Sequence, residues 1–199
     1  MSKKSVRLFS NNFLESLTHV HPIIPLLFWT PVILFLLWRS IFVHDLAVLS
    51  VAAIALPSIL VWTLTEYLFH RFVFHYQPTS AAGKWLIYLF HGVHHDDPTD
   101  KTRLVMPPAG AVLIMSLFWL FFASLIPAPW IEPFFAFFLI GYLAYDYLHY
   151  AVHHFRMKHP LLQSLKHSHM QHHFSRGKTA KYGVSSPLWD WIFGTRHHH

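Results

Sequence analysis

The sequence contains no cysteine and unusually little charge. Asp, Glu, Lys and Arg together make up 12% of its 199 residues, about half of the roughly 25% found in a typical soluble domain. The absence of cysteine excludes a disulfide framework and any zinc or iron–sulfur site built on thiolates. So few charges cannot cover a globular surface in the usual way. We therefore expect lipid to solvate part of the chain.

Long apolar runs take the place of the missing charge. Hydrophobic residues make up 54% of the sequence, and Phe alone occurs 19 times. Four runs of about 19–22 residues approach the roughly 20 that a helix needs to span a bilayer; they cover residues 23–43, 46–64, 105–126 and 130–148. Very short connections pair them into two helical hairpins. Buried hairpins in a soluble core are the alternative, but four such runs favour an all-α integral membrane protein.

The cations predict the orientation of these hairpins. Two hairpins place the N-terminal segment, the middle segment and the C-terminal tail on one side of the membrane. Of the 15 Lys and Arg residues, 14 lie on that side and Arg39 lies on the other. The positive-inside rule makes the crowded side cytoplasmic. For a bacterial chain the membrane would be the inner membrane, and for a eukaryotic chain the endoplasmic reticulum.

The net charge of +6 fits this topology and attraction to anionic headgroups. It does not indicate nucleic-acid binding, because no basic stripe alternates with stacking aromatics on a soluble face. The expected organisation is an N-terminal cytoplasmic or interfacial segment (1–22) followed by a membrane domain (23–195). A cytoplasmic helical cap is formed by 65–104 and 149–195, and 196–199 resembles the remnant of a purification tag.

Histidine is the most unusual component, with 19 residues. Three belong to the terminal run, and six that lie outside regular clusters are expected to be incidental: His19, His21, His44, His154, His159 and His167. The other ten form four clusters on the cytoplasmic side: His70 and His75; His91, His94 and His95; His149 and His153; His169, His172 and His173.

The clusters repeat along the chain. Four histidines of the first half return 78 residues later; the pairs are His75 and His153, His91 and His169, His94 and His172, and His95 and His173. His70 and His149 depart from this register by one residue. The echo therefore predicts two related half-sites.

Helical spacing predicts that the clusters converge. Residues three and four apart share a helix face, so His91, His94 and His95 are expected to meet at one point, and the other clusters likewise. The five-residue interval between His70 and His75 corresponds to roughly 140° around a helix of 3.6 residues per turn. These two can share a centre only where the helix bends or ends.

The number of histidines favours two metal ions. Ten imidazoles exceed the four ligands or so that one zinc ion needs, so about five nitrogens per ion fit better. Carboxylates that orient metal-bound histidines are expected close by, and the candidates are Glu66, Asp146, Asp97 and Asp100. Direct ligation by Asp146 is an alternative, and the last two also fit an ordinary solvated turn.

Together these patterns resemble the fatty acid hydroxylase/sterol desaturase superfamily. Four local stretches are similar to the fatty acid 2-hydroxylases, which hydroxylate sphingolipid acyl chains: Glu66–Phe72 (EYLFHRF), His91–His95 (HGVHH), Asp100–Pro108 (DKTRLVMPP) and Trp189–Thr195 (WDWIFGT). The resemblance covers roughly residues 59–195. It implies an O₂-dependent membrane enzyme that inserts a hydroxyl at C2 of a free fatty acid, ceramide or other sphingolipid.

The chemistry indicates which metal is needed. An unactivated C–H bond requires a metal that activates O₂ as co-substrate. Iron suits an all-nitrogen site with open positions, whereas zinc would bind the same imidazoles without redox activity, so the protein is expected to use two irons and to be isolable with zinc. The sequence shows no His-Pro-Gly-Gly haem motif of the cytochrome b5 domains common in eukaryotic relatives. A separate electron donor, cytochrome b5-like or ferredoxin-type, is therefore expected, as in a bacterial-type member.

Substrate contacts are expected beside the metals. Tyr142, Tyr145 and Tyr147 precede or flank the third cluster and are candidates for a lipid channel, with aromatic packing as the alternative. Lys101 and Arg103 are candidates for holding a headgroup or docking the electron donor, with topology-setting charge as the alternative.

Two other functions remain open at this point. A desaturase or a sterol or carotenoid hydroxylase would use the same histidines, because each reaction begins with hydrogen abstraction. A membrane metal transporter or metal store would also bind metal, but its ligands should lie near the bilayer midplane. The expected position of the clusters at the cytoplasmic helix ends favours the enzyme. The oligomeric state is not predictable from these features.

Overall fold

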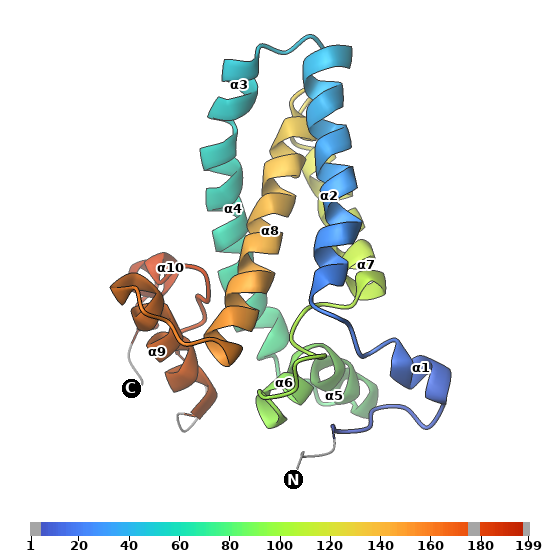
Figure 1. Ribbon diagram of the computed structural model, residues 1–199, viewed down its shortest axis with the longest axis vertical. Helices are drawn as coiled ribbons and strands as arrows, with labels where there is room; N and C mark the ends of the chain where they lie inside the picture. The colour runs from blue at the N-terminus through green and yellow to red at the C-terminus, as the bar shows by residue number, and fades with distance from the viewer. Residues whose placement is uncertain (1–4, 175–179, 197–199) are drawn as a thin grey trace.

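A 24-residue helix, α8 (Ile131–His154), forms the axis of the molecule. It packs along α2 (Ile23–Trp38) and α4 (Ala55–Phe69), which flank it in Figure 1. The structure is a computed structural model that describes residues 5–174 and 180–196, and all regular elements in those ranges are helical. The all-α expectation is confirmed there. The terminal run His197–His199 lies outside the described residues.

Shorter helices complete the bundle and build a cap at one end. Three π-helical segments directly continue longer helices: η1 (Arg39–Val43), η2 (His70–Phe74) and η3 (Tyr88–Gly92). The remaining helices are α1 (Asn12–Ser16), α3 (Val48–Ala53), α5 (Ala81–Ile87), α6 (Val93–Asp96), α7 (Pro108–Ala123), α9 (Pro160–Phe174) and α10 (Leu188–Ile192). Figure 1 shows α5 and α6 at the lower end of the bundle, below α2 and α7, and shows α9 and α10 at the lower left, beside α4 and α8.

Three helices are long and apolar enough to cross a membrane, against the four expected. They cover Ile23–Val43, Val48–Phe74 and Ile131–His154, so the second and third continue beyond the expected ends at residues 64 and 148. The fourth apolar helix, α7, has 16 residues and rises only about 24 Å, short of the roughly 30 Å of hydrocarbon. It begins late because a residue that precedes proline avoids helical geometry, and Pro107 is itself extended.

Aromatic side chains fill the space between α4 and α8. The Trp62 ring meets Phe138 and Tyr142 edge-on, with centroids 5.0 and 5.5 Å apart. Gly141 allows this contact, because a Cβ atom at that position would lie 2.6 Å from Trp62 Cγ. The outward faces of α2 and α7 expose apolar side chains such as Leu34. An apolar exterior of this kind suits lipid contact rather than water.

The Gly141→Ala variant should therefore lose stability. A rigid indole ring cannot move aside as a flexible side chain would, so overpacking should cost about 1–3 kcal/mol of unfolding free energy. Thermal unfolding in detergent measures the effect. Ala144→Leu on the exposed face of the same helix is the matched control, and an equal loss in both variants would contradict the argument.

A charged cluster closes the opposite end of the bundle. Glu132, at the start of α8, forms an ion pair with Arg39 Nη2 at 2.9 Å and lies 3.1 Å from His44 Nε2. The cluster ties η1 and the residue that follows it to α8. His44, expected to be incidental, therefore has a structural contact.

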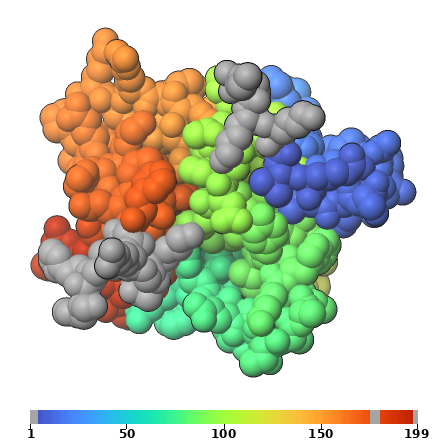
Figure 2. Space-filling model, turned by 90° about the horizontal axis from the view of Figure 1, so that it is seen from below, coloured from blue at the N-terminus to red at the C-terminus, as the bar shows by residue number. Residues whose placement is uncertain are grey.

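The N-terminal segment contains one short helix and folds onto the cap. α1 has five residues and is capped by Asn11, whose side chain accepts from the backbone N–H groups of Phe13 and Leu14. Phe13 and Leu17 remain largely exposed. Seen from below, the blue N-terminal segment lies against the yellow-green chain near residue 100 (Figure 2).

Candidate metal centre

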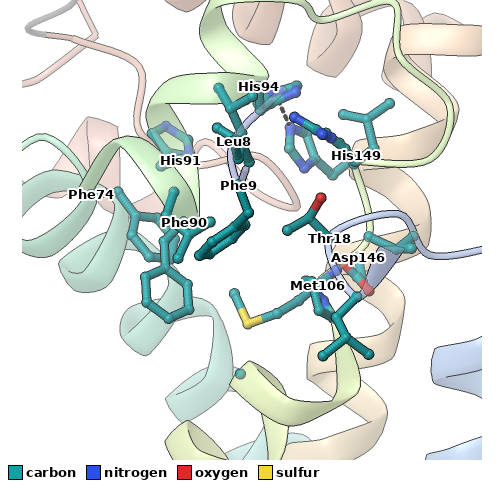
Figure 3. A pocket seen from close by; sticks show the side chains of 18 of the residues that line it. Leu8, Phe9, Thr18, Phe74, Phe90, His91, His94, Met106, Asp146 and His149 are labelled. Atoms are coloured by element: carbon teal, nitrogen blue, oxygen red, sulfur yellow. Dashed lines mark hydrogen bonds between the residues drawn. The ribbon is translucent and has the colours of Figure 1, made fainter. Parts of the chain in front are cut away.

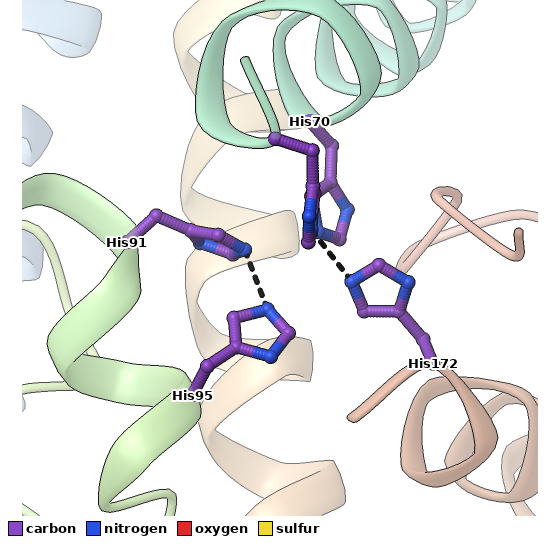
Figure 4. A group of neighbouring side chains, drawn as sticks. His70, His91, His95 and His172 are labelled. Carbon is purple, nitrogen blue, oxygen red and sulfur yellow. Dashed lines mark hydrogen bonds between the residues drawn. The ribbon is translucent and has the colours of Figure 1, made fainter. Parts of the chain in front are cut away.

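The structure brings all ten clustered histidines together in two groups of five at the cap end of the bundle. In each group the possible ligand atoms lie within 4.8 Å of one another. Group A contains His70, His75, His91, His95 and His172, and group B contains His94, His149, His153, His169 and His173. Figure 4 shows that the rings of His91, His95 and His172 turn toward the helix that carries His70.

Each group contains one histidine from the half of the chain that supplies most of the other group. This corrects an expectation from the sequence. His91, His94 and His95 do not converge on one point: His91 and His95 belong to group A and His94 to group B. On a helix, positions i and i+4 are about 40° apart, whereas i+3 falls on the other side of i, about 100° from i+4. In the second half His169 and His173 likewise share group B, and His172 reaches group A.

The exchange agrees with the 78-residue echo. His75, His91 and His95 of group A correspond to His153, His169 and His173 of group B, and His94 and His172 change places. Each half of the chain therefore supplies most of one group and one histidine of the other. Neither group is complete without both halves.

A π-helical turn solves the five-residue spacing of His70 and His75. The segment η2 begins at His70, and the backbone N–H of His75 donates to the His70 carbonyl at 3.2 Å. An i→i+5 bond of this kind places residues five apart on one face, and π-turns of this sort frequently mark functional sites. The helix changes its pitch at His70 and ends at Phe74.

The histidines approach one another through the same ring atom. Six pairs of Nε2 atoms lie 2.8–3.0 Å apart, among them His91 with His95 in group A and His94 with His149 in group B. Two nitrogens bound at right angles to one ion at roughly 2.0–2.1 Å would be about 2.9 Å apart. The spacing therefore fits nitrogen ligation by Nε2.

Two rings are oriented by backbone carbonyls of the segment that follows α9. His70 Nδ1 donates to the Tyr182 carbonyl at 2.5 Å, and His172 Nδ1 donates to the Ala180 carbonyl at 2.8 Å. These bonds fix the tautomers and leave Nε2 as the ligand atom. The Nε2 atom of His70 is buried and has no hydrogen-bond partner among the described residues. An orphaned, inward-facing nitrogen of this kind fits a metal ligand.

Asp190 holds the segment that orients these rings and was not singled out from the sequence. Its carboxylate accepts from the backbone N–H groups of Tyr182 and Gly183 at 2.9 and 2.7 Å. The Thr195 hydroxyl also donates to it. Asp190 stands in the WDWIFGT stretch that carried part of the family resemblance. That stretch was the available signal, but no local pattern revealed this role.

Two of the expected carboxylates, Glu66 and Asp146, bind backbone N–H groups near the metal centre. Glu66 accepts from the backbone N–H groups of Val184 and Ser185 at 2.6 and 2.9 Å. It therefore supports the same segment as Asp190, from the α4 side, and positions His70 through the backbone. Asp146 accepts from the Met106 backbone N–H at 3.3 Å.

The other two expected carboxylates stabilise the loop after α6. Asp97 accepts from the Thr99 hydroxyl at 2.7 Å, and Asp100 accepts from the Thr102 hydroxyl at the same distance. These are turn contacts. Asp97 is nevertheless buried, so its turn is not a solvated one, and the orienting roles expected for Asp97 and Asp100 stay predictions.

Burial keeps the cap histidines neutral. Burial lowers the pKa of His91, His94 and His169 well below the ordinary value, and the neighbouring imidazoles lower it further. Only the neutral imidazole has a free lone pair for a metal ion. The groups are therefore in the ligating protonation state at neutral pH.

An apolar cavity of about 230 Å³ opens beside group B. His94 and His149 form its roof in Figure 3, and Phe9, Phe90 and Met106 line its walls. The volume is below the roughly 300–1,000 Å³ of pockets that enclose a whole drug-sized ligand. The cavity can therefore hold only part of a lipid.

A second, smaller cavity of about 40 Å³ continues toward α4 and α7. Phe74, Met106 and Tyr145 line both cavities, and Tyr142 lines the smaller one. Tyr147 lies elsewhere, because its hydroxyl donates to the Pro22 carbonyl at the start of α2. Of the three candidate channel tyrosines, the structure brings two to a cavity wall.

The two cations that were candidates for docking, Lys101 and Arg103, differ in exposure. Lys101 is exposed, whereas the Arg103 side chain is only 4% exposed and forms an ion pair with Glu15. Arg103 therefore does not lie at the surface, and the headgroup and electron-donor roles expected for both residues stay predictions.

Comparisons with known proteins agree with these features. The fatty acid hydroxylase family model matches residues 55–195. The chain is 37% identical to dihydroceramide fatty acyl 2-hydroxylase FAH1 of Arabidopsis thaliana, over 98% of this chain and 81% of that protein. It is 33% identical to fatty acid 2-hydroxylase of Homo sapiens, over 96% and 57%. The hydroxylase domain visible in a solved structure of full-length scs7p superposes with a TM-score of 0.87 at 35% identity, covering 94% of this chain and 70% of that one.

Proposed function

The chain belongs to the fatty acid hydroxylase family and is an oxidoreductase of the membrane, and we propose that it hydroxylates C2 of a fatty acyl chain. The acyl chain belongs to a free fatty acid, a ceramide or another sphingolipid. The observation that carries this proposal is the pair of five-histidine groups beside an apolar cavity. The similar proteins are named for acyl 2-hydroxylation, and these names support the same chemistry for this chain.

The ten histidines would hold two iron ions, one in each group. When bound, a redox-active metal pair supplies the oxidant for an unactivated C–H bond, with O₂ as co-substrate. Five imidazole nitrogens in each group exceed the four ligands that zinc usually takes and would suit iron. Zinc would still bind these imidazoles, so isolated protein can carry it without activity.

The surrounding residues keep the histidines in place. The carbonyls of Ala180 and Tyr182 hold one ring tautomer at His172 and His70. Glu66 and Asp190 act through those carbonyls, because both bind the backbone N–H groups of the same segment. A defined ring orientation is what outer contacts contribute to metal sites.

The cavity beside group B is proposed to receive the acyl chain near its head. Its aromatic and aliphatic walls exclude water from the carbon to be oxidised. Tyr145 and Met106 stand where the two cavities meet, so the tail would pass them toward the apolar gap between α4 and α7. Lipid substrates would then enter from the bilayer.

The topology is proposed from the charges. The metal centre lies on the side that carries nearly all cations, which the positive-inside rule makes cytoplasmic. For that arrangement α7 would have to reach across the bilayer with the flanking apolar residues, or the bilayer would have to thin locally. Electrons would come from a redox protein on the same side, such as a cytochrome b5-like or ferredoxin-type donor.

Expression in iron-rich medium tests the proposal. Lipids of the host should gain one oxygen atom on acyl chains, and fragmentation should place it at C2. Metal analysis should give two ions per chain. No oxygenated lipid from protein that holds two irons and receives electrons from a competent reductant would refute the function.

A matched pair of variants on α9 separates the enzyme from a metal transporter. His172→Ala should lose bound metal together with lipid hydroxylation, whereas His167→Ala, on the exposed face, should retain both. Altered cellular metal uptake with unchanged lipids would instead support transport. Product with a new double bond would indicate a desaturase.

A further inference from the structure

The C-terminal helix α10 presents a large apolar surface to its surroundings. Trp191 and Ile192 at the end of the helix and Phe193 directly after it are 68%, 52% and 48% exposed. The acidic residue of this helix, Asp190, is buried. Neighbouring exposed apolar side chains of this size indicate contact with lipid or with protein rather than with water.

The position of α10 along the bundle indicates which of the two it contacts. Trp189 Nε1 donates to Thr63 Oγ1 at 3.0 Å, and Thr63 lies within Val48–Phe74, one of the helices long enough to cross a membrane. Thr63 precedes His70 by seven residues, which is about 10 Å at a rise of 1.5 Å per residue. Figure 1 accordingly shows α10 beside α4, above the lower end of that helix. The helix therefore lies at the depth of the membrane-spanning part of α4.

The face of α4 that α10 contacts is itself apolar and exposed further into the span. Leu56 and Leu60 precede Thr63 by seven and three residues, so they share its face of the helix, and both are exposed. Exposed leucines within a membrane-spanning helix are typical of a lipid-facing surface. The apolar surface of α10 continues this one toward the metal centre, where an interfacial tryptophan such as Trp191 is expected.

The helix α10 is also tied to the segment that orients His70 in group A. The Asp190 carboxylate accepts from the Tyr182 N–H at 2.9 Å, and the Lys181 N–H donates to the Thr195 carbonyl at 2.8 Å. The Tyr182 carbonyl in turn accepts from His70 Nδ1. A shift of α10 away from α4 would therefore move the carbonyl that fixes the His70 ring.

We propose that α10 is a membrane-surface anchor: Trp191, Ile192 and Phe193 insert into the leaflet on the side of the metal centre, and this insertion holds His70 in its ligating orientation. The partner of the surface is lipid, into which short apolar helix faces insert at the boundary between headgroups and acyl chains. The cap that the sequence places outside the membrane then lies partly within it. The inference rests on the proposed metal binding, and it makes α10 a positioning element of group A.

Because the chain has no cysteine, a single label can report the depth of α10. Ile192→Cys and, in a separate sample, His167→Cys would each carry one nitroxide on zinc-loaded protein in vesicles of phosphatidylcholine and phosphatidylglycerol. O₂, which concentrates in lipid, should relax the label at residue 192 more than a water-soluble nickel chelate does. The reverse should hold at residue 167, because His167 shares an exposed polar face of α9 with Gln163 and Ser164.

Zinc affinity in the same vesicles tests the link between α10 and the metal centre. Trp191→Ser combined with Ile192→Ser should bind one of the two zinc ions roughly tenfold more weakly in competition with a chelator, because loss of an outer contact typically weakens metal binding about 10–100-fold. The other ion should be held as in wild-type protein. A general loss of folding would instead weaken both ions.

Two further variants control for the loss of apolar surface. Trp191→Phe combined with Ile192→Leu keeps the surface of α10 apolar and should restore wild-type zinc affinity. Leu120→Ser changes an exposed position of α7, across the bundle from α10 (Figure 1), and should bind both ions as wild-type protein does. If the double serine variant does not fold, Trp191→Ser alone takes its place.

Nickel access above O₂ access at residue 192 would overturn the inference, as would wild-type zinc affinity or equal weakening of both ions in the serine variant. Spectral broadening at residue 192 that disappears on dilution with unlabelled protein would place a second copy of the chain on α10 and would also overturn it. Failure of the proposed function appears separately, as protein that holds two irons and keeps residue 192 in lipid but yields no 2-hydroxy product.

Discussion

Replacing His94 with alanine should empty the metal site of group B, in which the other four histidines come from the second half of the chain. His94 lies in the first-half HGVHH stretch, yet its Nε2 atom meets His149 and His173 at 2.9 and 3.0 Å. Loss of one nitrogen of five, at a buried position, should remove one of two metal ions. Activity should fall by more than the roughly 10–100-fold typical of outer-sphere changes. Metal analysis and turnover on the purified variant measure both effects.

Double variants test whether neighbouring histidines of one sequence cluster bind different metal ions. His94→Ala combined with His169→Ala should still lose one ion, because both residues belong to group B. His94→Ala combined with His91→Ala should lose both ions, although these residues are neighbours in sequence. The reverse pattern would mean that each cluster serves its own metal. His167→Ala is the control that should retain two ions.

Acid should unfold the metal-free protein steeply. Burial lowers the pKa of His91, His94 and His169 in the folded protein, whereas the unfolded chain regains the ordinary value of about 6.5. As the pH falls below about 6.5, the unfolded chain binds protons that the folded chain does not. Stability is therefore present above that pH and is lost below it, by about 1.4 kcal/mol per pH unit for each such group.

Two variants on α9 check the sign and the source of this effect. His169→Gln removes one buried imidazole and should reduce the slope of unfolding free energy between pH 6.5 and 5.5 by about 1 kcal/mol per pH unit. His167→Gln, on the exposed side, should leave the slope unchanged. Chelator-treated protein in detergent is the sample. An unfolding free energy that rises toward acid, or equal slopes in both variants, would contradict the assignment.

Much of the site was predictable because helical spacing is a local property. The clusters, their 78-residue echo and a ligand set large enough for two metals followed from residue type and interval alone. The ends of the helices were less predictable. The π-turn at His70 depends on a backbone bond that no propensity indicates, and the prolines before α7 shortened a run that hydropathy alone would extend.

The groups that orient the histidine rings could not be predicted either, and the reason is different. Carboxylates were expected next to the histidines, but backbone carbonyls of residues 180 and 182 orient two of them. Every residue has a carbonyl, so the sequence carries no mark of which one is used. Glu66 and Asp190 orient the rings only indirectly, because both hold the backbone of residues 182–185. That segment lies far from Glu66 along the chain.

Scarce charge and abundant apolar residues determined from the sequence that this protein is helical and meets lipid, and the histidine intervals determined that it could hold two metals. Only the tertiary structure decided how the ten histidines divide, because positions i+3 and i+4 diverge around a helix and each half lends one ring to the other. It also decided that Arg103 is buried rather than exposed to solvent. Burial and partner choice depend on segments that meet only after folding, and local spacing does not encode them.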